Sequence, residues 1–559
     1  MFRAHLREAA CLLTLFALFA NGCGPTARSE SALGERYFGS VAPPDRQILR
    51  YNNGAEPELL DPGLMSGQPD GRIARSLFEG LVTPHPETLE PEPGQAYRWE
   101  ISEDRTTYTF HLRPELRWNN GDPLTSRDFL YSWLRVLDPD VGSRYASLLY
   151  PIDQAEAFNQ REIADRGRVG LAAPDDSTFV VRLKSPTPYF LFVVSFYTFL
   201  PVHQGTIEAW GDRWTRPEHL VSNGPFELVE WRQGHHFRMR RSSTYWDAAS
   251  VRLEEIIAYA VEELNTSVNL YKSGVIDWNP SGYIPTPYVP FMRGYADFRS
   301  VPYHGVYFYS LNTTQPPLDD KWVRKALSAA VDRTTIADAV LKGTRLPWGN
   351  LTPSGYLGYE NPPGQTFDPE FARACLARAG YPDGRGFPPV DILFNTSEDH
   401  RRIAEAIQAM WKQHLNIDVS LSNQEWASYL NATTSLQYQI ARRSWIGDYP
   451  DPFTFLSIFR TGDGNNRTGW SNAEYDRLLG ASEFEPDPAE RMRMLARAES
   501  ILLEDGVVIN IYHYVLTEMV KPYVRGLYPT VLDTHPLKHV WIDTAWRPGD
   551  PVVAAGDGR

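Results

Sequence analysis

The sequence predicts a mixed α/β protein built from several lobes. Its 559 residues are too many for one hydrophobic core, because domains average roughly 100–200 residues. Segments of strand-like and helix-like periodicity alternate along the chain, and neither kind forms a long block. Hydrophobic residues make up 42% and charged residues 22%, which is typical of a globular protein. We therefore expect about three structural units.

The first expected elements are a strand and a helix. Ile48–Tyr51 reads as a strand that ends in the turn-forming segment Asn52–Gly54. Apolar residues spaced by four predict a helix over residues 72–82, and strict alternation predicts a half-buried strand over Tyr108–Leu112. The other elements expected without a capping signal are a helix over 401–415, a strand over 417–421 and a frayed tail over 548–559.

Two helices carry recognisable amino-terminal signals. Thr125 stands three residues ahead of Asp128, as in a capping box, and opens a helix over Phe129–Leu137. The acidic pair Asp319–Asp320 precedes an apolar-periodic stretch, where negative charge suits the positive end of the helix dipole. That stretch predicts one helix over Val323–Val340.

The amino terminus has the proportions of an export signal. Two arginines precede the apolar run Ala9–Ala20, which is too short to cross a bilayer. The run ends in Ala20-Asn21-Gly22-Cys23, which resembles a bacterial lipobox, although Ala20 stands where leucine is usual. We predict a signal peptide over 1–22, a lipid anchor on Cys23 and a polar tether over 23–46. The alternative is a plain secretory signal with an incidental cysteine.

Charge and motifs exclude several functions. The net charge of −14 argues against nucleic acid as a partner, because phosphate binding needs a basic surface. We found no zinc-protease, nucleophile-elbow or phosphate-loop motif, and the neighbours His235 and His236 would point to opposite faces of a strand. Cys375 is the single cysteine of the expected folded part, so no disulfide is expected there. We predict no enzyme activity, no metal and no cofactor.

Several separated segments resemble one family. They occur in order from about residue 50 to residue 545, and the stretch around Asp448 is the most specific of them. The segments are Glu56–Pro62, Leu77–Leu81, Tyr108–Arg113, Trp118–Thr125, Asn223–Phe226, Tyr245–Asp247, Val323–Arg333, Arg442–Pro452 and Gly464–Asn466. They are similar to the oligopeptide-binding branch of the family 5 extracytoplasmic solute-binding proteins.

The resemblance implies a fold and a division into lobes. The fold is that of periplasmic binding proteins (class II, cluster C), a three-lobed clam shell with mixed β-sheets and surrounding helices. Lobe I is expected to be discontinuous, over 47–70, 197–300 and 516–547, with lobe II over 71–196 and lobe III over 301–515. The family also implies short peptides as cargo, a monomeric receptor, and an ABC permease with its ATPase as partner.

The resemblance also assigns binding roles. Asp448 matches the aspartate that pairs with a peptide ammonium, a contact strengthened by charge. Main-chain groups near Glu56, Pro57 and Glu58 on one side, and near Ser444, Trp445 and Ile446 on the other, would hold the peptide as an added strand. Because those groups ignore ligand side chains, the family tolerates varied sequences. The alternative for Asp448 alone is a surface aspartate that caps a turn.

Other matched positions concern the far end of the peptide and its side chains. Arg442 and His400 match positions that can meet the carboxylate, and which of them does so depends on peptide length. His400 would contribute when protonated. Another basic group of some relatives is replaced here by Thr433 and Thr434, which leaves carboxylate recognition open. The expected pocket lining is Tyr145, Asn395, Trp426 and Asn465. Ordinary surface charge or core packing is the alternative for each of these residues.

The sequence therefore predicts a membrane-tethered receptor that captures short peptides for import and does no chemistry on them. Two other classes stay open. The same shell can hold another cargo, such as a dipeptide, a murein peptide, nickel, haem or an oligosaccharide. It can also serve in peptide signalling or as a folding chaperone.

Overall fold

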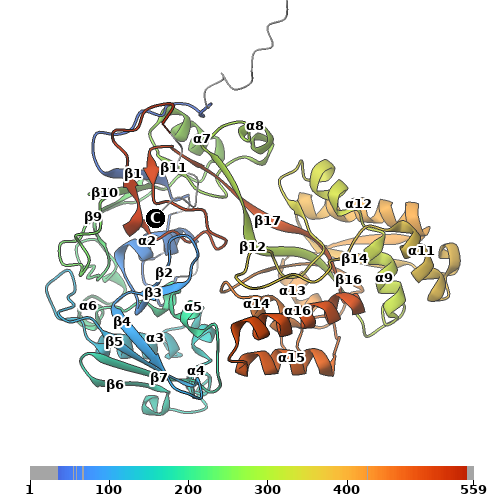
Figure 1. The fold of residues 1–559 in the computed structure, drawn as a ribbon, viewed down its shortest axis with the longest axis horizontal. Coiled ribbons are helices and arrows are strands. Elements are labelled where there is room, and N and C mark those ends of the chain that lie inside the picture. The colour runs from blue at the N-terminus through green and yellow to red at the C-terminus, as the bar shows by residue number, and fades with distance from the viewer. Residues whose placement is uncertain (1–35, 55, 58, 66–67, 425, 551–559) are drawn as a thin grey trace, which may run out of the picture.

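The computed structural model describes residues 36–550, except for residues 55, 58, 66–67 and 425. The elements gather into three lobes (Figure 1). Lobe I surrounds strands β1 and β8–β11, lobe II surrounds the small sheet β4–β7, and lobe III surrounds β14–β16 with the large helices. No helix of the described residues is long and apolar enough to cross a membrane.

One large sheet runs through lobes I and III. Its strand order is β15-β14-β16-β12-β17-β11-β1-β10-β9-β8, and β13 also pairs with β17. The strands of lobe I are β1 (Ile48–Asn52), β8 (Phe226–Arg232), β9 (His236–Arg241), β10 (Glu255–Tyr259) and β11 (Trp278–Asn279). The strands of lobe III are β13 (Leu346–Pro347), β14 (Val390–Asn395), β15 (Val419–Gln424) and β16 (Ile440–Ile446).

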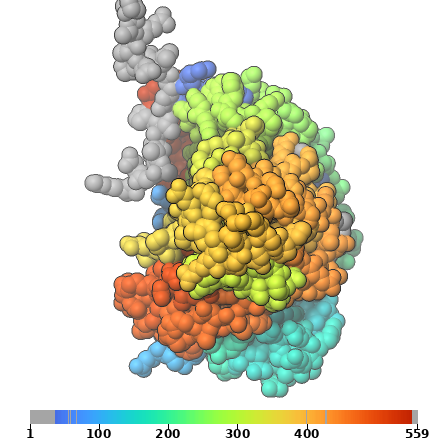
Figure 2. All heavy atoms as spheres, turned by 90° about the vertical axis from the view of Figure 1, so that its right-hand side faces the viewer, coloured from blue at the N-terminus to red at the C-terminus, as the bar shows by residue number. Residues whose placement is uncertain are grey.

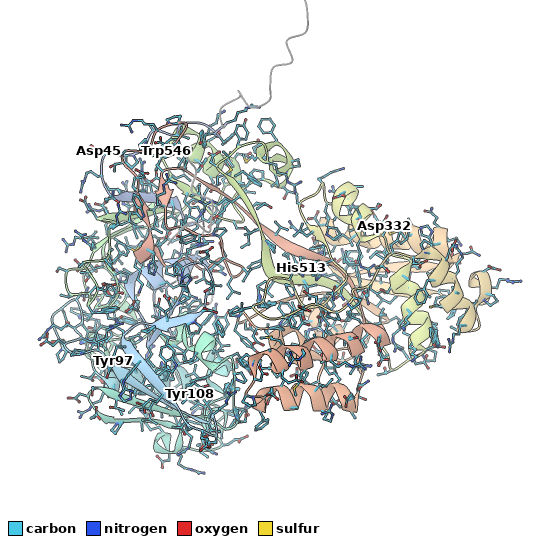
Figure 3. All side chains as sticks on the ribbon, in the orientation of Figure 1. Asp45, Tyr97, Tyr108, Asp332, His513 and Trp546 are labelled. Atoms are coloured by element: carbon cyan, nitrogen blue, oxygen red, sulfur yellow. The ribbon has the colours of Figure 1, made fainter. Side chains whose placement is uncertain are left out.

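Two long strands connect these lobes. β12 (Phe298–Leu311) and β17 (Val508–Val520) pair in antiparallel fashion along most of their length. They cross from lobe I into lobe III (Figure 1), and His513 lies on β17 within lobe III (Figure 3). Their pairing shifts register between Pro302 and Val306, where lobe III begins. This pair of strands is therefore a covalent connection between lobes I and III.

Lobe II is built on an antiparallel sheet of order β4-β5-β7-β6. Its strands are β4 (Ala96–Ile101), β5 (Thr107–Leu112), β6 (Leu171–Asp175) and β7 (Thr178–Arg182), with a separate β2–β3 pair (Val82–Pro84 and Pro91–Pro93) beside them. Its helices are α3 (Ser126–Leu137), α4 (Ala155–Asn159) and α5 (Phe190–Val194). The core of this lobe is continuous with that of lobe I.

The other helices surround the large sheet. Those near lobe I are α2 (Gln68–Leu77), α6 (Gln204–Trp210), α7 (Leu264–Ser273) and α8 (Val289–Met292), and the pair β18 (Val524–Arg525) and β19 (Trp541–Ile542) closes that lobe. Those of lobe III are α9 (Lys321–Ala329), α10 (Arg333–Thr335), α11 (Pro369–Arg378), α12 (Glu398–Leu415), α13 (Trp426–Thr434), α14 (Phe453–Leu456), α15 (Ala473–Phe484) and α16 (Pro488–Asp505).

Lobe III has a separate core on each side of its sheet. One core packs β12, β14 and β17 against α9, α11 and α12, and the other packs β12 against α14, α15 and α16. Figure 2 turns the outer side of this lobe toward the viewer, with α11 and α12 in yellow and orange near the front. The sheet of lobe III is thus covered on both faces, as its apolar strands require.

Most expected elements form, and the capping box of Thr125 with Asp128 is confirmed. Two helix predictions were wrong in extent. The helix expected over 72–82 ends at Leu77, because the N–H of Gly224 takes the Leu77 carbonyl and β2 begins soon afterwards. The helix expected over 323–340 breaks after Ala329, because Asp332 caps a new turn through Thr334 and Thr335.

Candidate functional site

A cavity of about 290 Å³ lies where the three lobes meet. Of the described residues that line it, Asp448 is the single acidic one and Arg75 the single basic one. The other lining residues are Gln68, Pro84, Leu89, Tyr145, Leu148, Phe192, Ser195, Phe196, Tyr197, Tyr303, Ile446, Gly447, Tyr449, Pro450, Leu532 and Thr534. Aromatic walls with few charged groups are typical of a ligand site.

Asp448 stands just beyond the end of β16 and faces this cavity. Its side chain reaches solvent, although protein atoms surround it on most sides. No cation of the described residues pairs with it, and this crowding raises the pKa of its carboxyl to about 6. The expected enclosure is therefore incomplete in this arrangement of the lobes, and the charge is uncompensated.

The loop that carries Asp448 packs tightly against lobe III and touches lobe II. The N–H of Gly447 donates to the His304 carbonyl (2.8 Å), and a Cβ at position 447 would overlap the His304 ring. That ring in turn donates to the Tyr449 carbonyl over 2.7 Å. The Tyr449 ring stacks on Tyr189 of lobe II, with centroids 4.1 Å apart and planes 3° apart. The loop is thus fixed on one side and forms a contact between lobes on the other.

A buried ion pair holds the far end of the same loop. Arg491 on α16 donates twice to the Asp451 carboxylate, over 2.6 and 2.9 Å. The same carboxylate accepts the Phe453 N–H at the start of α14. Both partners are almost fully buried, so the pair is a positional constraint on Asp448 rather than a second ligand group.

One edge of β16 is open next to Asp448. β12 covers the inner edge along the whole strand, including Ser444 against Tyr307 and Ile446 against Gly305. On the outer edge, β14 pairs with β16 only near Ile440. Over residues 444–446 no described strand occupies that edge, so its main-chain groups can accept an extended peptide.

The segment Glu56–Glu58, which was predicted to hold the other side of the peptide, has different surroundings from β16. Pro57 is buried, and the Glu56 carboxylate turns to the β8–β9 hairpin, where it accepts from Trp231 Nε1 (2.6 Å) and the Gly234 N–H (2.8 Å). The Glu56 side chain therefore anchors a hairpin. Glu58 lies outside the described residues.

Farther back along β16, a cationic cluster is built within lobe III. The Arg442 guanidinium lies over the Tyr307 ring at 4.7 Å and approaches the Asn395 amide oxygen (3.4 Å) and the Tyr514 hydroxyl (3.2 Å). His400 meets the Tyr307 hydroxyl through Nδ1 at 3.3 Å. No carboxylate of the described residues pairs with Arg442, so three predicted residues meet around an uncompensated charge.

His400 was expected to contribute when protonated, and its surroundings in the unliganded protein disfavour the protonated form. Burial, together with the charge of Arg442, lowers the pKa of His400 to about 3. The imidazole is therefore neutral at physiological pH, and a bound anion would have to raise its pKa before it could contribute charge.

Sequence reasoning missed Arg345. Its guanidinium lies 5.8 Å from the Tyr512 ring and 5.7 Å from the Tyr514 ring, so it shares Tyr514 with Arg442. It has no carboxylate partner among the described residues, and its Nε has no hydrogen-bond acceptor. Its only sequence signal was an arginine just ahead of the short strand β13, which is too common a pattern to single out.

The other predicted residues have different surroundings. Tyr145 lines the cavity and packs edge-on to Phe196 at 5.2 Å. Asn465 instead accepts from Arg443 through its carbonyl (3.1 Å), and the Trp445 ring packs into the core beside α14 and α16. The Trp426 side chain and Cys23 lie outside what the structure describes. The ring nitrogens of His235 and His236 lie 2.5 Å apart, because His235 sits in a turn and not in the strand as expected.

Comparison with known proteins adds independent findings. The family model described as "Bacterial extracellular solute-binding proteins, family 5 Middle" matches residues 90–467. The oligopeptide-binding protein OppA of Bacillus subtilis (strain 168) is 35% identical over 528 residues, which cover 92% of this chain and 95% of that protein.

Solved structures give the same result for the fold. The murein tripeptide-binding protein MppA in its unliganded open form matches with a TM-score of 0.82 at 30% identity, over 91% of this chain and 99% of that one. Haemophilus influenzae OppA in complex with the peptide RPPGFSPFR matches with a TM-score of 0.69 at 32% identity, over 89% and 99%. At similar identity, the lobes here are arranged more like those of the open form.

Proposed function

Because the chain belongs to the bacterial extracellular solute-binding proteins of family 5, we propose that it captures short peptides by their two ends and their backbone. One observation carries the proposal. The open edge of β16 runs between two uncompensated and opposite charges, Asp448 beyond its end and Arg442 along its length. A free peptide in extended form carries the complementary charges at its own ends.

Each part of the peptide has a partner in this scheme. The ammonium pairs with Asp448, and the leading residues add a strand to Ser444–Ile446. The carboxylate reaches Arg442, with Arg345 as a second cation beside Tyr514. The segment from Ile446 back to Arg442 spans about 13 Å in extended form, which suits a peptide of roughly three or four residues.

Binding of a peptide would also favour closure of the lobes. Asp448 belongs to lobe III, whereas Tyr145 and Arg75 reach the same cavity from the other side. A ligand that contacts both sides stabilises the closed state in proportion to its extra contacts there. We propose that the closed receptor delivers the peptide, chemically unchanged, to an ABC permease and its ATPase. We also propose that lipidated Cys23 holds the receptor at the membrane.

The test uses matched tripeptides and the intact mature chain. Ala-Ala-Ala with free ends should raise the melting temperature and bind at micromolar concentration in calorimetry. N-acetyl-Ala-Ala-Ala should bind at least about 100-fold more weakly, because Asp448 would lose its charged partner. Equal affinities for the free and acetylated peptides, or no binding of any tri- to pentapeptide, would contradict the proposal.

The main competing reading is a single favoured cargo, such as a murein peptide, rather than peptides in general. Native mass spectrometry of the protein as purified separates the two. A series of bound masses that fit mixed short peptides agrees with the proposal, whereas one mass common to all preparations indicates a dedicated cargo.

A further inference from the structure

The cavity at the lobe junction holds two charges of opposite sign that do not pair with each other. Asp448 enters it from lobe III, and Arg75 enters it from α2. The proposed function pairs the first charge with the peptide ammonium and assigns the second no charged partner. Among the described residues every other lining side chain is neutral, so the described part of the cavity offers a ligand one acid and one base.

The surroundings of Arg75 fix its guanidinium and leave most of its donors free. The Nη1 group donates to the Ser195 carbonyl at 3.0 Å. The guanidinium carbon lies 5.7 Å from the Phe196 ring centre and 5.5 Å from that of Tyr197. A guanidinium has five N–H donors, and Ser195 is its one protein acceptor among the described residues.

A structural role alone does not account for this arrangement. Ser195 ends α5, so Arg75 caps that helix, which is a common use of an arginine. One donor is enough for the cap. Arg75 is half-buried and lines the cavity, and none of its nitrogens is a fully buried donor without an acceptor. Burial lowers the pKa of Arg75 to about 10, so the group stays charged at neutral pH while lacking an anion.

We propose that Arg75 binds a second carboxylate of the captured peptide, namely the side chain of an acidic residue at its amino end. The inference rests on the proposed function, since it takes the ammonium to be at Asp448. A planar guanidinium that lies 5.7 and 5.5 Å from two aromatic ring centres and is held by the Ser195 carbonyl presents a fork of donors to a carboxylate. The ligand class is therefore a short peptide with a free amine and a glutamate or aspartate in the first two positions.

Peptides that differ by one charge test this directly on the unmodified protein. Glu-Ala-Ala should bind at least about fivefold more tightly than Gln-Ala-Ala by calorimetry at low salt, and Ala-Glu-Ala compared with Ala-Gln-Ala locates the position. Equal affinities within both pairs would overturn the inference. Failure of all four peptides to bind would instead contradict the proposed function, so the two failures are distinguishable.

Variants then assign the preference to Arg75. The Arg75→Gln change should abolish the Glu/Gln ratio while Gln-Ala-Ala still binds, and Arg75→Lys should retain part of it. Arg127→Gln, which removes an exposed charge on α3, is the matched control and should leave the ratio unchanged. A ratio that persists in Arg75→Gln would place the carboxylate elsewhere and overturn the assignment.

A folding control and a dipeptide control accompany these measurements. Circular dichroism melts of each unliganded variant show whether loss of the α5 cap has unfolded lobe II, and Arg75→Lys supplies a folded comparison if Arg75→Gln does not fold.

The terminal carboxylate of a very short peptide has the same chemistry as an acidic side chain. If Arg75→Gln weakens Ala-Ala but not its amide, and the Glu/Gln ratio is one, Arg75 serves dipeptide ends and the acidic side-chain inference is overturned.

Discussion

The two charged regions along β16 are built in different ways. Beyond its end, Asp448 stands in solvent within a cavity that side chains from three lobes share. Four residues before that end, Arg442 is buried inside lobe III among Tyr307, Tyr514 and Asn395. The Asp448 carboxylate is therefore not fully enclosed in this arrangement of the lobes. The cationic cluster around Arg442, in contrast, is already assembled within lobe III.

Under the proposed function, the two regions bind their ligand groups in different ways. A preformed cluster within one lobe can bind a carboxylate without any movement of the lobes. The Asp448 cavity is lined from several lobes, so under the proposed function a ligand that binds there is coupled to their arrangement. The Tyr189–Tyr449 stack already joins the two sides at one margin, which limits how far apart they lie around Asp448.

The strongest test of the contrast is to remove the acid. Asp448→Asn keeps the shape of the side chain but removes its charge, so the peptide ammonium would be buried without a counter-ion. Affinity for Ala-Ala-Ala should fall about 100-fold, or roughly 3 kcal/mol, as measured by calorimetry at pH 7. Asp338→Asn, which removes an exposed carboxylate outside the cavity, is the matched control.

The same variant should not weaken the unliganded protein. The raised pKa of Asp448 means that its ionised form is disfavoured in the folded state relative to the unfolded chain. This destabilisation grows as pH rises from about 4 to 6 and persists above it. Removing the charge should therefore leave unfolding free energy at pH 7 unchanged or raise it by up to about 1 kcal/mol, after solvent screening. A large loss of stability would show that binding fell through unfolding.

Arg442→Gln should have a smaller effect, because Arg345 lies beside the same tyrosine and can take part of the carboxylate charge. We expect roughly a 20-fold loss of affinity for Ala-Ala-Ala, and little loss for its carboxyl amide. Arg373→Gln on the exposed face of α11 controls for charge removal. If the free acid and the amide weaken equally, Arg442 does not meet the carboxylate and the contrast along β16 fails.

The fold was largely predictable from the sequence, and the site only in part. The family resemblance and the three-lobed clam shell were confirmed by the matches to related proteins and structures. The Thr125–Asp128 cap was readable because its signal is local. The break at Ala329 was not, because periodic apolar residues continue beyond it while Asp332 starts a new turn.

Arg75 and Arg345 show what local patterns cannot supply. The surroundings of each arginine come from residues far along the chain. Arg75 contacts Ser195 and Phe196, and Arg345 lies beside Tyr514. An arginine in a helix or before a strand is ordinary, and only the fold shows that it lacks an acid. The roles of Asp448, Arg442 and the other site residues stay predictions until the peptides are measured.

A change of pH should have the smallest effect and distinguishes the Asp448 region from the Arg442 region. Only an ionised Asp448 can pair with an ammonium, and its pKa of about 6 puts the carboxyl about nine-tenths ionised at pH 7 and one-tenth at pH 5. Affinity for Ala-Ala-Ala should therefore fall about tenfold over that range, and His400 stays neutral across it in the unliganded protein, because its pKa is about 3. Calorimetry at pH 6 in buffers of different ionisation enthalpy should show release of about half a proton per peptide. In Asp448→Asn both the slope and the proton release should vanish. An affinity that rises on acidification would mean that a protonated group, and not this carboxylate, controls capture.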